Sequence, residues 1–338
     1  MSKAVIILAI ESSCDDTSAA ILKDRKILSN IVANQEVHSL YGGVVPELAS
    51  RAHQQNIIPV VDAAIRKANI KKENITAIAF TKGPGLLGSL LVGSSFAKSF
   101  AMGMNIPIIA VNHMQGHILS HFIDEGNPIP EFPFLCLTVS GGHTQIVRVE
   151  SPNKMKVIGT TIDDAAGEAF DKSAKILGLT YPGGPIIDKH AKKGNIHAFE
   201  FGKPKIKELN FSFSGLKTSI LYKIQNNMQK NPKFIEENLE DLCASIQHSI
   251  VSVLLKKIEK AIIQTGIKEL AIAGGVAANS YLRSELGKLA KKKRYQLYIP
   301  KFEYCTDNAA MIAIAGYFKY LDKDFAQQSE TPSARLPF

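Results

Sequence analysis

Residues 4–22, AVIILAIESSCDDTSAAIL, place a short acidic turn between two apolar runs. The β-branched run at residues 4–10 indicates a buried strand, and residues 17–22 indicate a second strand after the turn. A related unit returns about 127 residues later, with strands at residues 134–139 and 144–149 around the turn Ser140-Gly141-Gly142-His143. The repeat predicts two lobes of common design, although such units also recur by chance.

A second pair of segments supports the duplication. Residues 78–80 lead into Thr81-Lys82-Gly83-Pro84-Gly85 and a helix, as residues 270–273 lead into Gly274-Gly275-Val276 and a helix. The offset of about 192 residues is about 65 longer than the first, which predicts an insertion within residues 151–238. We therefore expect a first lobe of residues 1–112 plus 308–338 and a second lobe of residues 113–307.

Apolar residues at three- and four-residue spacing predict helices at 54–68, 87–102, 168–177, 239–265 and 309–321. Strands that alternate with helices indicate the α/β class, with a parallel component. The chain after Lys323 is expected to be loose.

The composition limits the class of protein. With 338 residues and 45% hydrophobic content, the chain exceeds one usual domain. A net charge of +9 favours polyanionic partners, although much of it is lysine and is also consistent with a compositional bias. The cysteines are far apart in sequence, which fits a reducing cytoplasm. No apolar run approaches about 18 residues, so we expect a soluble protein without a membrane partner.

His113 and His117 stand four residues apart, so on a helix both rings project from one face and can hold one metal ion. Imidazole suits iron or zinc. Met114 replaces the glutamate that a zinc protease needs after its first histidine. The alternatives are a surface pair of histidines, and His121 on the same face as a further ligand or a solvated residue.

An acidic third ligand would complete this site. Asp307 precedes a predicted helix and is either that ligand or the N-cap of the helix. Glu11, Asp15 and Asp16 in the acidic turn are the other candidates.

Glycine-rich turns follow several buried strands, and their backbone N–H groups can approach a phosphate closely. They are Ser140-Gly141-Gly142-His143, Gly183-Gly184 and Gly274-Gly275. The chain lacks a Walker loop, and Pro84 interrupts the dinucleotide-like spacing of Gly83 to Gly88. A single turn of this kind is usually a β-turn, but their recurrence favours nucleotide binding.

A series of motifs resembles, nearly end to end, the tRNA N6-adenosine threonylcarbamoyltransferase family in its bacterial or organellar branch, once called O-sialoglycoprotein endopeptidases. In order they are ESSCDDT (11–17), GGVVPELASR (42–51), GPG (83–85), NHMQGH (112–117), VSGGHT (139–144), DDAAGEAFDK (163–172), YPGGP (181–185), FSFSGLK (211–217), GGVAAN (274–279) and CTDNAAM (305–311).

The resemblance implies a two-lobed actin/sugar-kinase/Hsp70-like ATPase fold with duplicated mixed-sheet lobes and a metal between them. The implied metal ligands are His113, His117 and Asp307. One divalent ion per subunit is expected, iron(II) in the first place and zinc or magnesium as alternatives.

The implied reaction moves the threonylcarbamoyl group from threonylcarbamoyl-AMP to N6 of adenosine 37 in tRNAs that read ANN codons, and AMP leaves. Contacts to the adenylate would come from Thr138, Val139, Ser140, Gly141, Gly142, Asp171, Gly184, Asp188 and Asn279. Asp15, Asp16 or His143 would take the amine proton.

Some positions depart from the family pattern. Ala277 replaces a frequent serine, and Gly202-Lys203-Pro204 replaces the usual Pro-Arg-Pro. Lys203, Lys205, Lys207 and the run Lys291-Lys292-Lys293-Arg294 suit tRNA phosphates, although the run also fits a solvated helix end.

The resemblance implies protein partners as well, namely a smaller homologous protein that forms a heterodimer through helices of the first lobe, and a small P-loop ATPase. Three other classes remain as alternatives: an ATPase or small-molecule kinase of the same fold, a metalloprotease, which Met114 disfavours, and a non-catalytic binding module.

Overall fold

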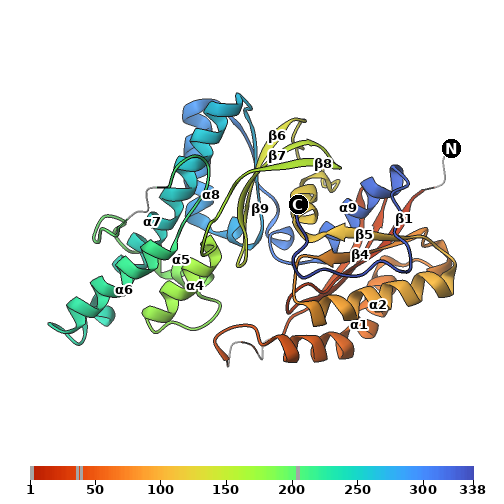
Figure 1. Cartoon of the computed structure of the whole chain (residues 1–338), viewed down its shortest axis with the longest axis horizontal. Coiled ribbons are helices and arrows are strands. Elements are labelled where there is room, and N and C mark those ends of the chain that lie inside the picture. Colours follow the sequence, from red (N-terminus) through yellow and green to blue (C-terminus); the bar gives the residue numbers. More distant parts are fainter. Residues whose placement is uncertain (1–3, 36–37, 39–40, 203–205) are drawn as a thin grey trace. The chain divides into compact units, whose positions relative to one another are not determined.

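A computed structural model describes residues 4–35, 38, 41–202 and 206–338 of the chain (Figure 1). Lys203 and Lys205, two of the candidate tRNA contacts, lie outside these residues.

The chain divides into two compact units. The first comprises Met1–Pro130, Ser151–Met155 and Pro300–Phe338, and the second comprises Glu131–Glu150 and Lys156–Ile299. Residues 113–130 and 300–307 thus lie in the first unit, whereas the sequence-based division assigned them to the second lobe.

The first unit is built on a five-stranded sheet of order β3-β2-β1-β4-β5. Its strands are β1 (Ile6–Glu11), β2 (Thr17–Lys23), β3 (Lys26–Ala33), β4 (Ala77–Gly83) and β5 (Ile108–Asn112). β2 runs antiparallel to both β1 and β3, whereas β4 pairs parallel with β1 and β5 pairs parallel with β4. The acidic turn therefore connects β1 to β2, as predicted.

The second unit repeats this plan with a sheet of order β10-β9-β6-β7-β8. The strands are β6 (Phe134–Val139), β7 (Thr144–Ser151), β8 (Lys154–Thr160), β9 (Glu269–Ala273) and β10 (Gln296–Tyr298). As β1 does, β6 pairs with the next strand antiparallel and with a later strand parallel. The duplication inferred from the two strand-turn-strand segments is visible in this shared strand order, and the α/β class is confirmed.

Helices cover both faces of the first sheet. α1 (Pro46–Ala68) and α2 (Leu87–Met104) pack side by side on one face, over a core of aliphatic side chains and Phe80 (Figure 1). α9 (Ala309–Leu321) packs on β1, β2, β4 and β5, and α3 (His113–Leu119) packs on α9. α1 begins before residue 54 because its first turns are polar and start at Pro46, a favoured residue at a helix N-terminus.

The second unit carries the remaining helices, which pack on one another. They are α4 (Ala166–Ile176), α5 (Gly183–Ala191), α6 (Ser214–Met228), α7 (Phe234–Thr265) and α8 (Ser280–Lys293). α5 and α6 fall in the predicted insertion and were not anticipated as helices. α6 starts where Asp163 accepts hydrogen bonds from the backbone N–H groups of Phe213 and Ser214, a contact that local sequence does not reveal.

Candidate metal centre and nucleotide-facing residues

The paired histidines lie on α3, which begins where the parallel strand β5 ends. The side chain of Asn112 caps this helix and accepts hydrogen bonds from the backbone N–H groups of Met114, at 2.9 Å, and Gln115. His113 and His117 are therefore one turn apart on a helix, and both are buried. The helical spacing inferred from the sequence is confirmed, and the exposed surface pair is excluded.

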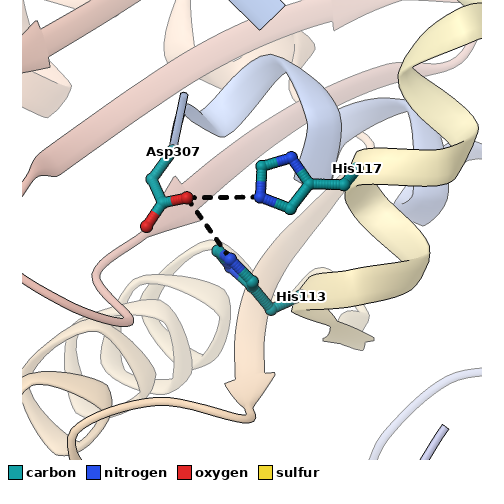
Figure 2. A group of neighbouring side chains, drawn as sticks. All are labelled: His113, His117 and Asp307. Carbon is teal, nitrogen blue, oxygen red and sulfur yellow. Dashed lines mark hydrogen bonds and ion pairs between the residues drawn. The ribbon is translucent and has the colours of Figure 1, made fainter. Parts of the chain in front are cut away.

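The third member of the group is Asp307, which comes from the start of α9. Asn308 is the N-cap of this helix, because its Oδ1 accepts from the backbone N–H of Met311. The capping interpretation of Asp307 is therefore wrong, and its carboxylate faces the histidines (Figure 2). Asp307 Oδ1 lies 3.4 Å from His113 Nε2 and 3.2 Å from His117 Nε2.

Gly116 lets the two helices approach closely enough to form this group. A Cβ atom at Gly116 would lie 3.1 Å from Ile312 Cδ1 and 3.3 Å from the carbonyl oxygen of Met311, both on α9. The glycine stands between the two histidines in sequence, so α3 packs on α9 beside the site.

Glu11, at the end of β1, is fully buried and faces the other nitrogen of the His113 ring. Its Oε2 lies 3.1 Å from His113 Nδ1. It also accepts hydrogen bonds from the Thr81 hydroxyl and the Ser13 backbone N–H, so the carboxylate is held in place. The sequence offered Glu11 as a ligand, whereas the structure makes it the partner that orients a ligand.

Burial and charge together set the protonation of this group. Burial alone would raise the pKa of Asp307, but His113 and then His117 outweigh it and lower that pKa. Burial alone would lower the pKa of His113, but Asp307 and Glu11 raise it well above its usual value. The pKa of His117 is lowered, chiefly by burial. The two carboxylates thus favour the protonated form of His113, whereas burial favours the neutral form of His117.

These residues fit a divalent metal ion. The donor atoms of His113, His117 and Asp307 all lie within 4.8 Å of one another. Two imidazoles and one carboxylate are a known donor set for iron(II) and also suit zinc. Binding of a metal through His113 Nε2 would require that nitrogen to be deprotonated. His121, in the 3-10 helix Ser120–Phe122, is not a member of the group.

The acidic turn is anchored by His53 of α1, a residue that the sequence analysis missed. His53 Nε2 lies 3.0 Å from the carbonyl oxygen of Cys14 and must donate to it, so Nδ1 accepts from the Thr17 hydroxyl at 2.7 Å. Burial lowers the pKa of His53 and keeps the ring neutral. The turn that carries Asp15 and Asp16 is therefore fixed at both ends.

Asp16 has the protonation behaviour of a base that works near neutral pH. Burial, and then the charges of Asp15, Asp307 and Glu11, raise its pKa to about 7. Burial also raises the pKa of the neighbouring Cys14 thiol, which stays protonated.

The glycine-rich turn after β6, which we predicted to approach a phosphate, is a tight hairpin in the second unit. The backbone N–H of Ser140 donates to the carbonyl oxygen of His143 at 2.8 Å, and Ser140 Oγ accepts from the His143 N–H. Gly141 and Gly142, at its tip, are exposed. Thr138 and Val139 are the last residues of β6. His143 therefore belongs to the second unit, whereas Asp15 and Asp16 belong to the first.

The other candidate nucleotide residues hold helix N-termini in the second unit. Asp171 Oδ1 accepts from the Gly183 N–H at 2.8 Å, next to Gly184 in the first turn of α5, and burial raises its pKa. Asp188 accepts from the backbone N–H and the hydroxyl of Ser280.

Asn279 caps α8 through Oδ1 and donates from Nδ2 to Gln247 Oε1 at 2.7 Å. Its side-chain amide thus links the start of α8 to α7. Gln247, on α7, is a second residue that the sequence analysis missed.

Within the described ranges, no helix is both long and apolar enough to span a membrane.

Comparison with solved structures identifies the fold. Full-length HypF in its phosphate- and nucleotide-bound form matches with a TM-score of 0.61 at 13% identity, over 95% of this chain and 47% of HypF. Component A of (R)-2-hydroxyglutaryl-CoA dehydratase from Acidaminococcus fermentans matches with a TM-score of 0.52 at 16% identity, over 95% of this chain and all of that one. These neighbours carry the actin/sugar-kinase/Hsp70-like ATPase fold, and the expected fold class is confirmed.

Sequence comparison identifies the family. A profile described as tRNA N6-adenosine threonylcarbamoyltransferase matches residues 26–314. Two proteins of that name, from Christiangramia forsetii and Riemerella anatipestifer, are 63% and 61% identical to the chain, and each alignment covers 98% of both sequences. The chain therefore belongs to the tRNA N6-adenosine threonylcarbamoyltransferase family of tRNA-modifying transferases.

Proposed function

We propose that the chain transfers the threonylcarbamoyl group of threonylcarbamoyl-AMP to N6 of adenosine 37 in tRNAs that read ANN codons. The observation that carries the proposal is the assembled group of His113, His117 and Asp307 in a chain of this family. N6 attacks the carbonyl carbon of the mixed anhydride, a C–N bond forms, the bond from that carbon to the phosphate oxygen breaks, and AMP leaves with the electron pair.

A divalent metal held by His113, His117 and Asp307 would supply positive charge close to a phosphate. We assign iron(II) first, with zinc or magnesium as alternatives, because two imidazoles and a carboxylate suit iron(II). Glu11 fixes the His113 ring, so that Nε2 faces the metal position.

Asp16 is the preferred acceptor of the proton that N6 loses. A carboxylate with a pKa of about 7 is partly deprotonated at neutral pH and still basic enough to accept a proton. Asp15 and His143 remain the alternatives.

The adenylate is proposed to bind in the second unit. The exposed glycine hairpin at Gly141 and Gly142 offers backbone N–H groups to a phosphate. Asp171 and Asp188 each accept hydrogen bonds at a helix N-terminus. The remaining lone pairs of their carboxylate oxygens would accept hydrogen bonds from ribose hydroxyls. The full proposed contact set is Thr138, Val139, Ser140, Gly141, Gly142, Asp171, Gly184, Asp188 and Asn279.

The proposed protein partners are a smaller homologous protein and a small P-loop ATPase. α1 and α2 carry exposed apolar side chains, among them Ile58, Leu87 and Leu91, which support a heterodimer through these helices. The cysteines are free thiols, which supports a cytoplasmic location.

A label-transfer assay tests the proposal against the kinase alternative. Threonylcarbamoyl-AMP labelled in the threonine is mixed with excess enzyme and tRNA, and a parallel reaction contains ATP labelled in the γ-phosphate with candidate small-molecule acceptors. The proposal predicts label in tRNA, lost when adenosine 37 is replaced by guanosine. Transfer of the γ-phosphate without transfer to tRNA would favour the kinase alternative.

A further inference from the structure

Residues 326–337, called the strap below, run along the first sheet and end beside α3 (Figure 1, dark blue, up to the label C). Ala326 donates its N–H to the carbonyl oxygen of Ile108 on β5 at 2.9 Å. Further on, Ser333 donates to the carbonyl oxygen of Lys82 at 2.8 Å. The prediction of a loose chain after Lys323 is therefore wrong, because backbone hydrogen bonds tie this segment to β5 and to the end of β4.

The strap passes β4 so closely that only glycine fits beneath it. Gly83 has φ +151°, and a Cβ atom there would lie 1.9 Å from the carbonyl oxygen of Ser333. An ion pair between Lys82 and Glu330, with 2.5 Å between Nζ and Oε1, holds the strap at the same place.

The last contact of the strap is with Asn112, the residue that caps α3. Asn112 Nδ2 donates a hydrogen bond to the carbonyl oxygen of Pro337 at 2.9 Å. Asn112 Oδ1 accepts a hydrogen bond from the backbone N–H of Met114 in the first turn of α3. One amide thus joins the strap to the helix turn that begins with His113.

A second route connects the strap to the same histidine. The N–H of Gly85 donates to the carbonyl oxygen of Ala334, and the N–H of Leu86 donates to the carbonyl oxygen of Ser13 at 2.7 Å. The hydroxyl of Ser13 lies 3.1 Å from His113 Nδ1. The strap therefore supports segments on both sides of the His113 ring.

The strap borders a cavity. A cavity of about 270 Å³ is lined by Asn112, Gln115, Phe325, Glu330 and Pro337 among others. Asn112 and Gln115, at the start of α3, line this cavity, and the hydrogen bonds of Asn112 fix the turn on that side.

We infer that the strap is a positioning element of the metal centre, which holds the capped first turn of α3 so that His113 stays aligned with His117 and Asp307. The inference rests on the proposed metal site, and its first readout does not require a metal.

Two variants remove the hydrogen bond between Asn112 and Pro337, and a third displaces the strap. Asn112→Ser keeps an N-cap oxygen but loses the amide that donates to Pro337. A chain shortened by residues 331–338 lacks that acceptor. In Gly83→Ala the new Cβ meets the carbonyl oxygen of Ser333 and displaces the strap, while the sequence of the strap and Asn112 itself are kept; Gly83 pairs with Asn112 in the sheet, so this variant is interpreted together with the other two. Arg335→Ala is the matched control, because this strap side chain is exposed.

The experiment measures hydrogen exchange of the Met114 and Gln115 amides in the metal-free protein, and then the affinity for Co²⁺ by absorption titration. Loss of one hydrogen bond predicts about fivefold faster exchange and about fivefold weaker binding in Asn112→Ser and Gly83→Ala, and at least as large an effect in the shortened chain, with Arg335→Ala unchanged. Unchanged exchange in Asn112→Ser and Gly83→Ala overturns the inference, even if the shortened chain fails to fold. Failure of the wild type to bind Co²⁺ contradicts the metal site instead, and the exchange data still decide the role of the strap.

Discussion

At the scale of single residues, the metal group depends on a chain of buried contacts. Glu11 holds His113 Nδ1, and Thr81 and Ser13 hold Glu11. The ring therefore keeps the orientation in which Nε2 faces Asp307. Strands β1 and β4 and the acidic turn between β1 and β2 thus contribute to fixing one imidazole.

The first prediction concerns Glu11. Glu11→Gln removes the charge opposite His113 Nδ1 and should weaken metal affinity by about 10–100-fold, the usual effect of losing such a partner. Calorimetric titration of the metal-free protein with Zn²⁺ measures the affinity. Asp15→Asn, in the same turn, is the control, and an equal loss in both variants would show a general charge effect instead of orientation.

The second prediction concerns the pH dependence. Asp16 has a pKa raised to about 7, so its basic form is depleted as the pH falls below 7. The single-turnover transfer rate should rise between pH 6 and 8 in the wild type, a range chosen to bracket this value. Asp16→Asn should be about 100-fold slower and lack this rise. If Asp16→Asn keeps the wild-type profile, another group is the base.

At the scale of elements, helix starts bring the three residues of the candidate metal centre into place. β5 leads directly into α3 and places the histidines, and the N-terminus of α9 places Asp307. The N–H of Ala309 also donates to the hydroxyl of Ser18 on β2, which ties this helix start to the sheet.

The third prediction concerns the cap of α9. Asn308→Ala leaves the Met311 N–H without its acceptor and should lower the free energy of unfolding by about 1 kcal/mol, with weaker metal binding. Urea unfolding and a metal titration measure the two effects. Asn308→Asp retains the cap oxygen and should recover most of the stability; no recovery would show that capping is not the role of Asn308.

Local patterns predicted the elements that have strong periodicity or a tight turn. The α9 bounds, the β6 hairpin and the helical spacing of the histidines all follow from neighbours in sequence. The role of Glu11, the anchor at His53 and the strap were missed, because each depends on partners tens to hundreds of residues away. The choice between Asp307 as cap and as ligand also needed the structure, since adjacent Asn308 can cap equally well.

At the scale of the whole molecule, two units with the same sheet order carry different candidate residues. The metal group lies wholly in the first unit and the proposed adenylate residues wholly in the second. The exposed apolar side chains of α1 and α2 also belong to the first unit. Each set of candidate residues can thus be altered in one unit at a time.

The fourth prediction concerns the partner surface. Replacing Leu87 and Leu91 by Ser removes exposed apolar area from α2 and should separate the chain from the proposed smaller homologous partner in size-exclusion chromatography of the co-expressed pair. Met102→Ser, an exposed position near the other end of α2, is the control. Co-elution of both variants with the partner would place the interface elsewhere.

The central claim is that transfer requires one metal ion bound by His113, His117 and Asp307. The most direct measurement adds iron(II) back to chelated protein without oxygen and follows bound metal and single-turnover transfer to tRNA together. The account predicts that both saturate at one ion per chain, and that Asp307→Ala neither retains the ion nor transfers the group. Full transfer by the metal-free protein, or by Asp307→Ala, would contradict it.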